Sequence, residues 1–183
     1  MLRRGGSEMA TDMKMLIAEH FDALVRQRGI DKVTVKAVIE DCGISRQTFY
    51  YHFKDLMDLL EWRAQRMTER MIERSLKAET PQAALSEFVR TMAENRALLH
   101  KLISSQRRGQ VERILFGAVR TYLEELLRRS DKAMRGEYRD AELALDLLAF
   151  GLTGILIQRC SSDQELDPDR LAEQLLRILG ERI

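Results

Sequence analysis

Apolar residues recur every three or four positions along most of this chain, a spacing that is typical of amphipathic α-helices. The first clear example begins near Asp12, where Leu16, Ile17 and Phe21 share one side of the predicted helix. We expect this helix to end at Gly29, because glycine readily adopts the left-handed conformation that commonly follows a helix.

Two short helices are predicted next, separated by a turn at Gly43. Thr34 and Ser45 stand where their hydroxyl groups can accept hydrogen bonds from the first-turn N–H groups of these helices. A short helix, a turn containing glycine and another short helix form the outline of a helix-turn-helix, here about residues 34–53. Helices of this length are unstable alone, so the preceding helix must brace them.

Helical patterns continue to the end of the chain, with Pro168 at the preferred first position of the last helix. Because we find no strand hairpin, repeat or low-complexity segment, we expect an all-α fold with an N-terminal three-helix domain and a C-terminal helical domain. The remaining predicted helices cover about residues 55–77, 82–95, 96–106, 110–130, 138–160 and 168–180.

The second helix of the helix-turn-helix has two different faces. Phe49 and Phe53 lie one turn apart and share a side with Ile44, so we expect them in the core. The other side chains of this segment can all donate hydrogen bonds, and no acidic residue occurs between Cys42 and Lys54. Such a face suits the phosphate backbone and the base edges of nucleic acid.

Composition and charge limit the kind of protein and the kind of nucleic-acid site that the sequence can form. The chain has 183 residues, of which 45% are hydrophobic, enough for a globular protein with a sizeable core. Its formal net charge is only +1, so a nucleic-acid site must be a local patch. Cys42 and Cys160 lie far apart without metal-ligand spacing, which favours a reducing compartment over a disulfide.

The sequence indicates a cytoplasmic protein without a membrane partner. The N-terminus lacks the apolar segment of a secretory signal. The longest apolar run, Leu143–Ile157, contains Asp146 and is expected to be too short to span a membrane. There is also no metal-ligand cluster, no nucleophile beside a base and no phosphate-binding loop. We therefore expect no enzyme activity, no metal and no cofactor, against the rival hypothesis of an all-α enzyme.

The run "TVKAVIEDCGISRQTFYYHFK" resembles the signature of the TetR family of transcriptional regulators, roughly T-V-x-x-I-A-x-x-A-G-V-S-x-x-T-x-Y-x-Y/H-F. The resemblance covers residues 12–60 and implies a homodimeric, sequence-specific DNA-binding regulator that acts on a palindromic operator, usually as a ligand-responsive repressor. We therefore expect three parts in the chain. They are a flexible arm (1–11), a helix-turn-helix DNA-binding domain (12–56) and an effector-binding and dimerisation domain (57–183).

The resemblance also implies which residues contact DNA. Arg46 and Gln47 would read bases, and Lys54 would contact phosphate. In one departure, Leu56 replaces a lysine that often contacts phosphate in the family. The full implied set is Thr34, Lys36, Arg46, Gln47, Thr48, Tyr50, Tyr51, His52 and Lys54.

The run "RQTFYYHFKDLMDLLEW" further resembles the branch of the family that contains activators of dihydroxyacetone kinase operons. In that branch a partner protein, and not a small molecule, can control the regulator. The alternatives to a ligand-responsive repressor are therefore an activator controlled by a protein partner, or a helical adaptor that binds protein without binding DNA.

The C-terminal part of the sequence suggests hypotheses about a ligand site and a dimer interface. Trp62, Met67 and Met71 either line a pocket for a small-molecule effector or only pack the core, and His100 is either a ligand contact or an ordinary histidine. The apolar helices at 138–160 and 168–180 are expected to form the homodimer interface.

Gly151 and Gly154 would allow a partner helix to approach closely within that interface. Two recognition helices held about one duplex turn apart could then read a palindrome.

Overall fold

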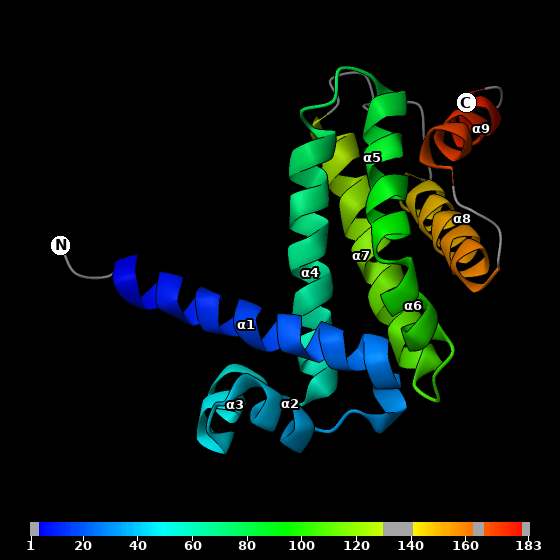
Figure 1. The fold of residues 1–183 in the computed structure, drawn as a ribbon. Helices are drawn as coiled ribbons and strands as arrows, with labels where there is room; N and C mark the ends of the chain where they lie inside the picture. The colour runs from blue at the N-terminus through cyan, green and yellow to red at the C-terminus, as the bar shows by residue number, and fades with distance from the viewer. Residues whose placement is uncertain (1–3, 130–140, 163–166, 181–183) are drawn as a thin grey trace.

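The computed structural model of the chain describes residues 4–129, 141–162 and 167–180 (Figure 1). Regular structure in these residues is helical throughout, which confirms the all-α fold class. One short 3-10 helix, η1 (Ile30–Lys32), lies between the first two α-helices. The α-helices are α1 (Arg4–Arg28), α2 (Val35–Cys42), α3 (Arg46–His52), α4 (Leu56–Ser75), α5 (Pro81–Glu94), α6 (Arg96–Ile103), α7 (Arg108–Arg129), α8 (Ala141–Ser161) and α9 (Pro168–Gly180).

The first helix begins earlier than the sequence pattern predicts. α1 starts at Arg4 and not near Asp12, so residues 4–11 are helical and the prediction of a flexible arm over that stretch is wrong. Gly5 and Gly6 lower the helix propensity, but no proline blocks the turn and good helix formers follow. The helix therefore extends upstream of its buried stripe, and its first turns point away from the rest of the molecule (Figure 1).

Capping side chains define the start of several other helices. Thr34 Oγ1 accepts a hydrogen bond from the backbone N–H of Ala37 at 3.1 Å, as predicted. Asp167 Oδ1 accepts from the N–H groups of Asp169 and Arg170, both at 3.1 Å, at the start of α9. These bonds satisfy N–H groups that would otherwise lack a partner in the helix.

Helices α1, α2 and α3 form a small unit that we call the head, at the lower end of the molecule in Figure 1. α1 lies across α2 and α3 and covers their apolar sides. Phe21 of α1, Val38 of α2 and Phe49 of α3 are completely buried in the resulting core. The two short helices therefore gain their stability from α1, as expected for elements of this length.

Helices α4 to α9 form a larger unit that we call the body. α7 packs against both α4 and α8, and α5 packs against α4 and α9. The fully buried Tyr122 of α7 lies between the end of α4 and α5, where its hydroxyl is 2.8 Å from Ser75 Oγ and its ring stacks on Phe88 with 4.8 Å between centroids. Burial raises the pKa of Tyr122 to about 12, so the phenol stays neutral and can remain in this apolar setting.

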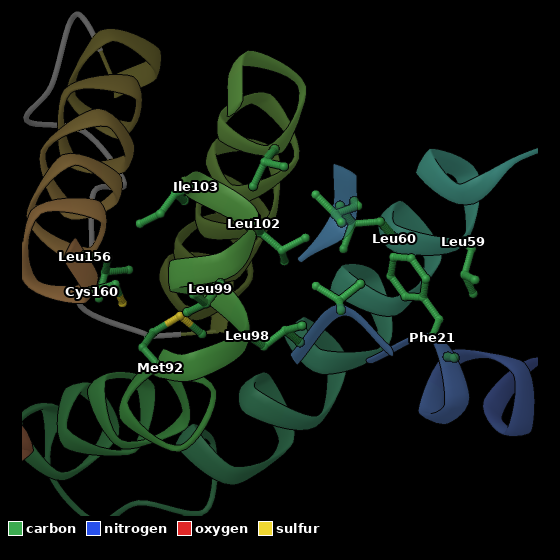
Figure 2. Close-up of a cluster of buried hydrophobic side chains, with 14 of the residues drawn as sticks. Phe21, Leu59, Leu60, Met92, Leu98, Leu99, Leu102, Ile103, Leu156 and Cys160 are labelled. Atoms are coloured by element: carbon green, nitrogen blue, oxygen red, sulfur yellow. The ribbon is translucent and has the colours of Figure 1, made fainter. Parts of the chain in front are cut away.

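α4 joins the head to the body. Its residues Leu59 and Leu60 belong to the same buried cluster as Phe21 of α1 (Figure 2). Arg63 Nε, one turn further on, donates a hydrogen bond to Asp22 Oδ2 of α1 at 2.9 Å. The first two turns of α4 are thus packed with the head, so a movement of this helix changes the position of the head.

α8 extends beyond the apolar run of the sequence. The helix continues past Ile157, and Glu142–Ser161 has 20 residues, with a mean hydropathy of 1.5 over an 18-residue window, a length and composition that core helices of soluble proteins also reach. Among the described residues this is the one helix long and apolar enough to cross a membrane. Only 33% of that window is buried in the chain, so much of its apolar surface is exposed.

Candidate nucleic-acid interface and interior gap

A tight turn at Gly43 sets the position of α3. Gly43 has φ 66°, in the left-handed region, and the N–H of Ile44 donates to Ile39 O at 3.2 Å to close the end of α2. Ser45 then caps α3 by accepting a hydrogen bond from the N–H of Thr48 at 3.0 Å. The sequence predictions for the turn and for this cap are both confirmed.

One side of α3 is anchored in the core. Phe49 is fully buried and Phe53 is 2% exposed, with 6.0 Å between their ring centroids. The Phe53 ring also meets Trp62 of α4 edge-on at 5.7 Å, and Lys14 Nζ of α1 lies 5.2 Å from the Phe53 centroid. Contacts to α1 and α4 together fix the orientation of α3, so its opposite side is presented to solvent in a defined way.

The solvent side of α3 carries hydrogen-bond donors. Arg46, Gln47, Tyr50 and Tyr51 are exposed, and Tyr51 has 81% of its surface in solvent. The Arg46 guanidinium lies 5.5 Å from the Tyr50 ring centroid, a cation–π contact that restrains a long side chain. The exposed phenol of Tyr51 is available to donate a hydrogen bond to a partner.

The carboxylates around this face are engaged elsewhere. Asp41 Oδ2 lies 2.7 Å from His20 Nδ1 of α1. Asp55 Oδ1 accepts hydrogen bonds from two N–H groups in the first turn of α4, at 2.7 and 2.9 Å. Glu40 Oε1 lies 3.7 Å from Lys36 Nζ, and such an exposed pair is weak enough for Lys36 to exchange it for a phosphate. These contacts hold the neighbouring carboxylates in place, and α3 itself carries no acidic residue.

The remaining candidate residues lie at the edges of this face. His52 is half-buried, and burial, together with the nearby Lys14, lowers the pKa of its imidazole. His52 is therefore neutral at pH 7 and can donate one hydrogen bond without adding charge. Thr48 is half-buried beside it, whereas Lys54, just after α3, and Thr34, before α2, are exposed.

All nine residues for which the resemblance implies DNA contacts thus lie on α2 and α3 or next to them, on the end of the head (Figure 1). The structure adds a feature that the sequence did not suggest, the pairing of Asp22 with Arg63 at the joint between head and body. These residues are 41 positions apart and have ordinary charged side chains, so no local pattern could have linked them.

The body contains a small interior gap of about 30 Å³ between α4, α5, α6, α7 and α8. Met67 and Met71, two of the four residues considered for ligand contact, line it. The other two do not: Trp62 packs on Phe53 at the joint, and His100 is on the exposed side of α6. α6 turns its leucines inward, which leaves His100 facing solvent.

No group of three or more His, Cys, Asp or Glu side chains that could hold a metal ion occurs within the described residues. Cys42 and Cys160 are free thiols. Burial, with a smaller effect of Asp41, raises the pKa of Cys42 to about 11, and burial also raises the pKa of Cys160. Neither thiol is activated as a nucleophile.

Comparison with protein families gives two matches along the chain. Residues 22–61 match the family described as "Bacterial regulatory proteins, tetR family". Residues 79–181 match the family described as "Transcriptional regulator C-terminal region". Together these matches cover the end of α1, α2, α3 and the start of α4, and then the body from α5 to α9. None of the curated proteins compared with the chain matches it.

Solved structures share the whole fold. "Dihydroxyacetone kinase operon activator DhaS" is 19% identical, with a TM-score of 0.66 over 93% of this chain and 96% of that one. A TetR transcriptional regulator from Streptococcus agalactiae 2603V is 16% identical, with a TM-score of 0.66 over 95% and 97%. The fatty acid degradation regulator FadR from Bacillus halodurans is 18% identical, with a TM-score of 0.62 over 93% and 96%. Because these identities are low, the similarity shows a shared fold and does not by itself show a shared function.

Proposed function

Since this chain belongs to the TetR family of transcriptional regulators, whose members bind DNA and typically act as dimers, we propose that it is a homodimeric repressor of a palindromic operator. The observation that carries the proposal is the exposed face of α3, which presents donors, lacks carboxylates and is fixed from behind by Phe49 and Phe53. The protein acts in the cytoplasm, where the operator is, and it has no catalytic role and no membrane partner.

α3 enters the major groove in this proposal. Arg46 and Gln47, in its first turn, read base edges, as residues at the start of a recognition helix usually do. The other contacts fix the position of the head on the duplex and go mainly to phosphates. These come from Thr34, Lys36, Thr48, Tyr50, Tyr51, His52 and Lys54.

The dimer forms through α8 and α9. On α8, Leu143, Leu147 and Phe150 are exposed by 69%, 70% and 64%, and they recur at helical spacing on one side. Gly151 and Gly154 lie on the same exposed side. A soluble protein rarely leaves such an apolar stripe in water, so a second copy of the chain is its natural cover. In this proposal residues 12–56 are the DNA-binding domain, and residues 57–183 are the effector-binding and dimerisation domain.

The response to an effector would pass through α4. Met67 and Met71 of this helix line the interior gap, and Arg63, one turn before them, holds Asp22 of α1. A molecule that spreads the gap therefore shifts the helix that carries the head, and so changes the spacing of the two recognition helices in a dimer. Release from the operator is the expected result of that shift.

A second candidate is an activator that a protein partner controls. Two observations favour it: the likeness to DhaS, which is named as an operon activator, and an open groove of about 830 Å³ between α4 and α7. The groove carries Asp58, Glu61 and Glu69 on its α4 side, so a basic segment of a partner would fit it. In this case the interior gap remains packed and the groove is the regulatory surface.

Salt dependence tests DNA binding itself. Each phosphate contact releases counterions, so log affinity for random duplex DNA should fall with log salt by about 0.9 per contact. A slope near zero would leave a helical adaptor that binds only protein. This measurement needs no knowledge of the operator.

Direct readout is tested at Arg46. We predict that Arg46→Ala weakens operator binding by about 1–3 kcal/mol and relaxes the base preference at one position. The control is Arg74→Ala, since Arg74 is exposed near the end of α4 in the body, and it should leave both quantities unchanged. An equal loss on all DNA sequences would make Arg46 a phosphate contact instead.

A further inference from the structure

Thr153 of α8 has a hydroxyl group without a hydrogen-bond partner. The residue is only 6% exposed, and its Oγ1 atom contacts no donor or acceptor among the residues that the structure describes. A buried hydroxyl in this state costs about 1–3 kcal/mol relative to a bonded one. Such a cost is usually avoided, so its presence in the core of the body requires an explanation.

The other buried threonines behave differently. A threonine inside a helix ordinarily donates to the carbonyl four residues earlier. Thr68 Oγ1 donates to Ala64 O at 2.9 Å, and Thr91 Oγ1 donates to Glu87 O at 2.9 Å. Thr153 sits within a regular helix and has the same option, yet it does not take it.

Thr153 lines the interior gap, and most of the other side chains that line it are flexible and apolar. Leu156 and Cys160 of α8 face Met92 of α5 and Leu99 of α6 across this region (Figure 2). A second gap of about 30 Å³ adjoins the first, since both are lined by Met67 and Leu99. Methionine adapts its shape easily, so the first response to a guest in these narrow spaces is a movement of side chains.

The lining also limits what the guest can be. Among the described residues, no charged side chain lines the first gap, and the Cys160 thiol stays neutral because burial raises its pKa. Arg63 lies at the second gap, but its guanidinium already bonds to Asp22. A carboxylate placed here would have no free cation, and burying it would be costly. A water molecule would be poorly held too, because it needs two to four partners.

We propose that this gap binds an uncharged, flexible and mostly hydrocarbon molecule, one oxygen of which accepts a hydrogen bond from Thr153 Oγ1. The proposal rests on the proposed function, in which the body binds an effector, and it names the chemical class of that effector. Two small adjoining gaps suit a flexible chain better than a rigid ring system. The Thr153 hydroxyl selects a ligand that carries an oxygen acceptor, and the methionine side chains move to make space for the ligand.

Octanol and octanoate are suitable probes, because they share a chain length and differ in charge. Binding is measured at pH 8 on the full chain without DNA, by isothermal titration and by the rise in the unfolding temperature. We expect octanol to bind and octanoate to bind at least about tenfold more weakly. Octanoate binding as tightly as octanol, or no binding of octanol, would overturn the proposed class.

The variant that tests the hydroxyl is Thr153→Val, which keeps the shape of the side chain. Octanol should bind this variant about 2- to 12-fold more weakly, the loss expected for one neutral hydrogen bond. Thr153→Ser keeps the hydroxyl and should bind octanol like the parent chain. Thr68→Val is the matched control, because Thr68 lines the same gap but its hydroxyl is already bonded to Ala64 O.

Equal octanol affinity in Thr153→Val and the parent chain would refute the role of the hydroxyl. The variant should fold at least as stably as the parent, since it removes an unsatisfied group. Operator binding is measured separately with and without octanol. If octanol binds through Thr153 but leaves operator binding unchanged, the ligand site stands and the proposed ligand response fails.

Discussion

Replacing Gly151 by alanine separates the helix propensity of α8 from its packing in a dimer. Gly151 lies in the middle of this helix, is exposed, and shares the apolar side with Leu147 and Phe150. Within the described part of the chain, no atom lies within 4 Å of the position that its Cβ would take. Gly117, in the middle of α7, is equally exposed and open, but it lies in the groove between α4 and α7. It is therefore a matched control.

The two substitutions have the same effect in an isolated chain. Alanine loses less backbone entropy than glycine in a helix, so each should raise the free energy of unfolding by about 0.5–1 kcal/mol. If a partner helix packs against Gly151, the same substitution destabilises the dimer. An added methyl group in a close-packed interface costs about 1–3 kcal/mol, which raises the dimer Kd roughly 5- to 150-fold. Gly117→Ala should leave the Kd unchanged.

Sedimentation equilibrium gives the dimer Kd of each variant, and urea unfolding of the monomer at low concentration gives the helix contribution. The reasoning is refuted if Gly151→Ala dimerises as tightly as the parent chain and gains as much stability as Gly117→Ala. That result would mean that no partner helix approaches α8 at this glycine. A loss of monomer stability in both variants would instead contradict the helix-propensity argument.

Three further predictions concern the head. Gly43→Ala should lower the free energy of unfolding by about 1–2 kcal/mol, because φ is 66° at this position and no described atom would meet the new Cβ. Gly43→Asn should lower it less, since asparagine tolerates the left-handed conformation better. Urea unfolding measures both variants. Burial raises the pKa of the Asp22 carboxyl more than Arg63 lowers it, so the native state holds the proton more tightly than the unfolded chain and loses stability as the pH rises above about 4. Asp22→Asn should therefore gain stability relative to the parent over that range, and a relative loss would place that pKa below its ordinary value. Iodoacetamide should modify Cys42 slowly at pH 8 and faster towards pH 11, because the pKa of its thiol is about 11; fast labelling at pH 8 would contradict this.

Much of the head follows from local sequence. Thr34 and Ser45 cap α2 and α3, and Gly43 makes the turn between them, because these contacts join residues within a few positions of one another. The division of α3 into a buried side with Phe49 and Phe53 and an exposed side also follows from helical periodicity. The start of α1 was not predicted, because its apolar pattern becomes clear only near Asp12, whereas the helix begins at Arg4.

The candidate site in the body was only partly predictable. Met67 and Met71 line the gap, but an apolar pattern could not distinguish them from Trp62, which packs at the joint. His100 was a candidate because it lies in an apolar segment, yet it faces solvent. Which side of a helix meets which neighbour depends on the packing of several helices at once, and that information is not in any single segment.

The sequence by itself determined the all-α class, most helix positions, the helix-turn-helix and the donor-rich face of α3, because each depends on periodicity and on contacts between near neighbours. Tertiary structure alone decided which side of α8 is exposed, since that helix is apolar around most of its circumference and carries no internal sign of its orientation. It also decided that Asp22 meets Arg63 and that Thr153 is left unbonded in the core. Those outcomes arise from contacts between distant segments, and only the packed chain brings the segments together.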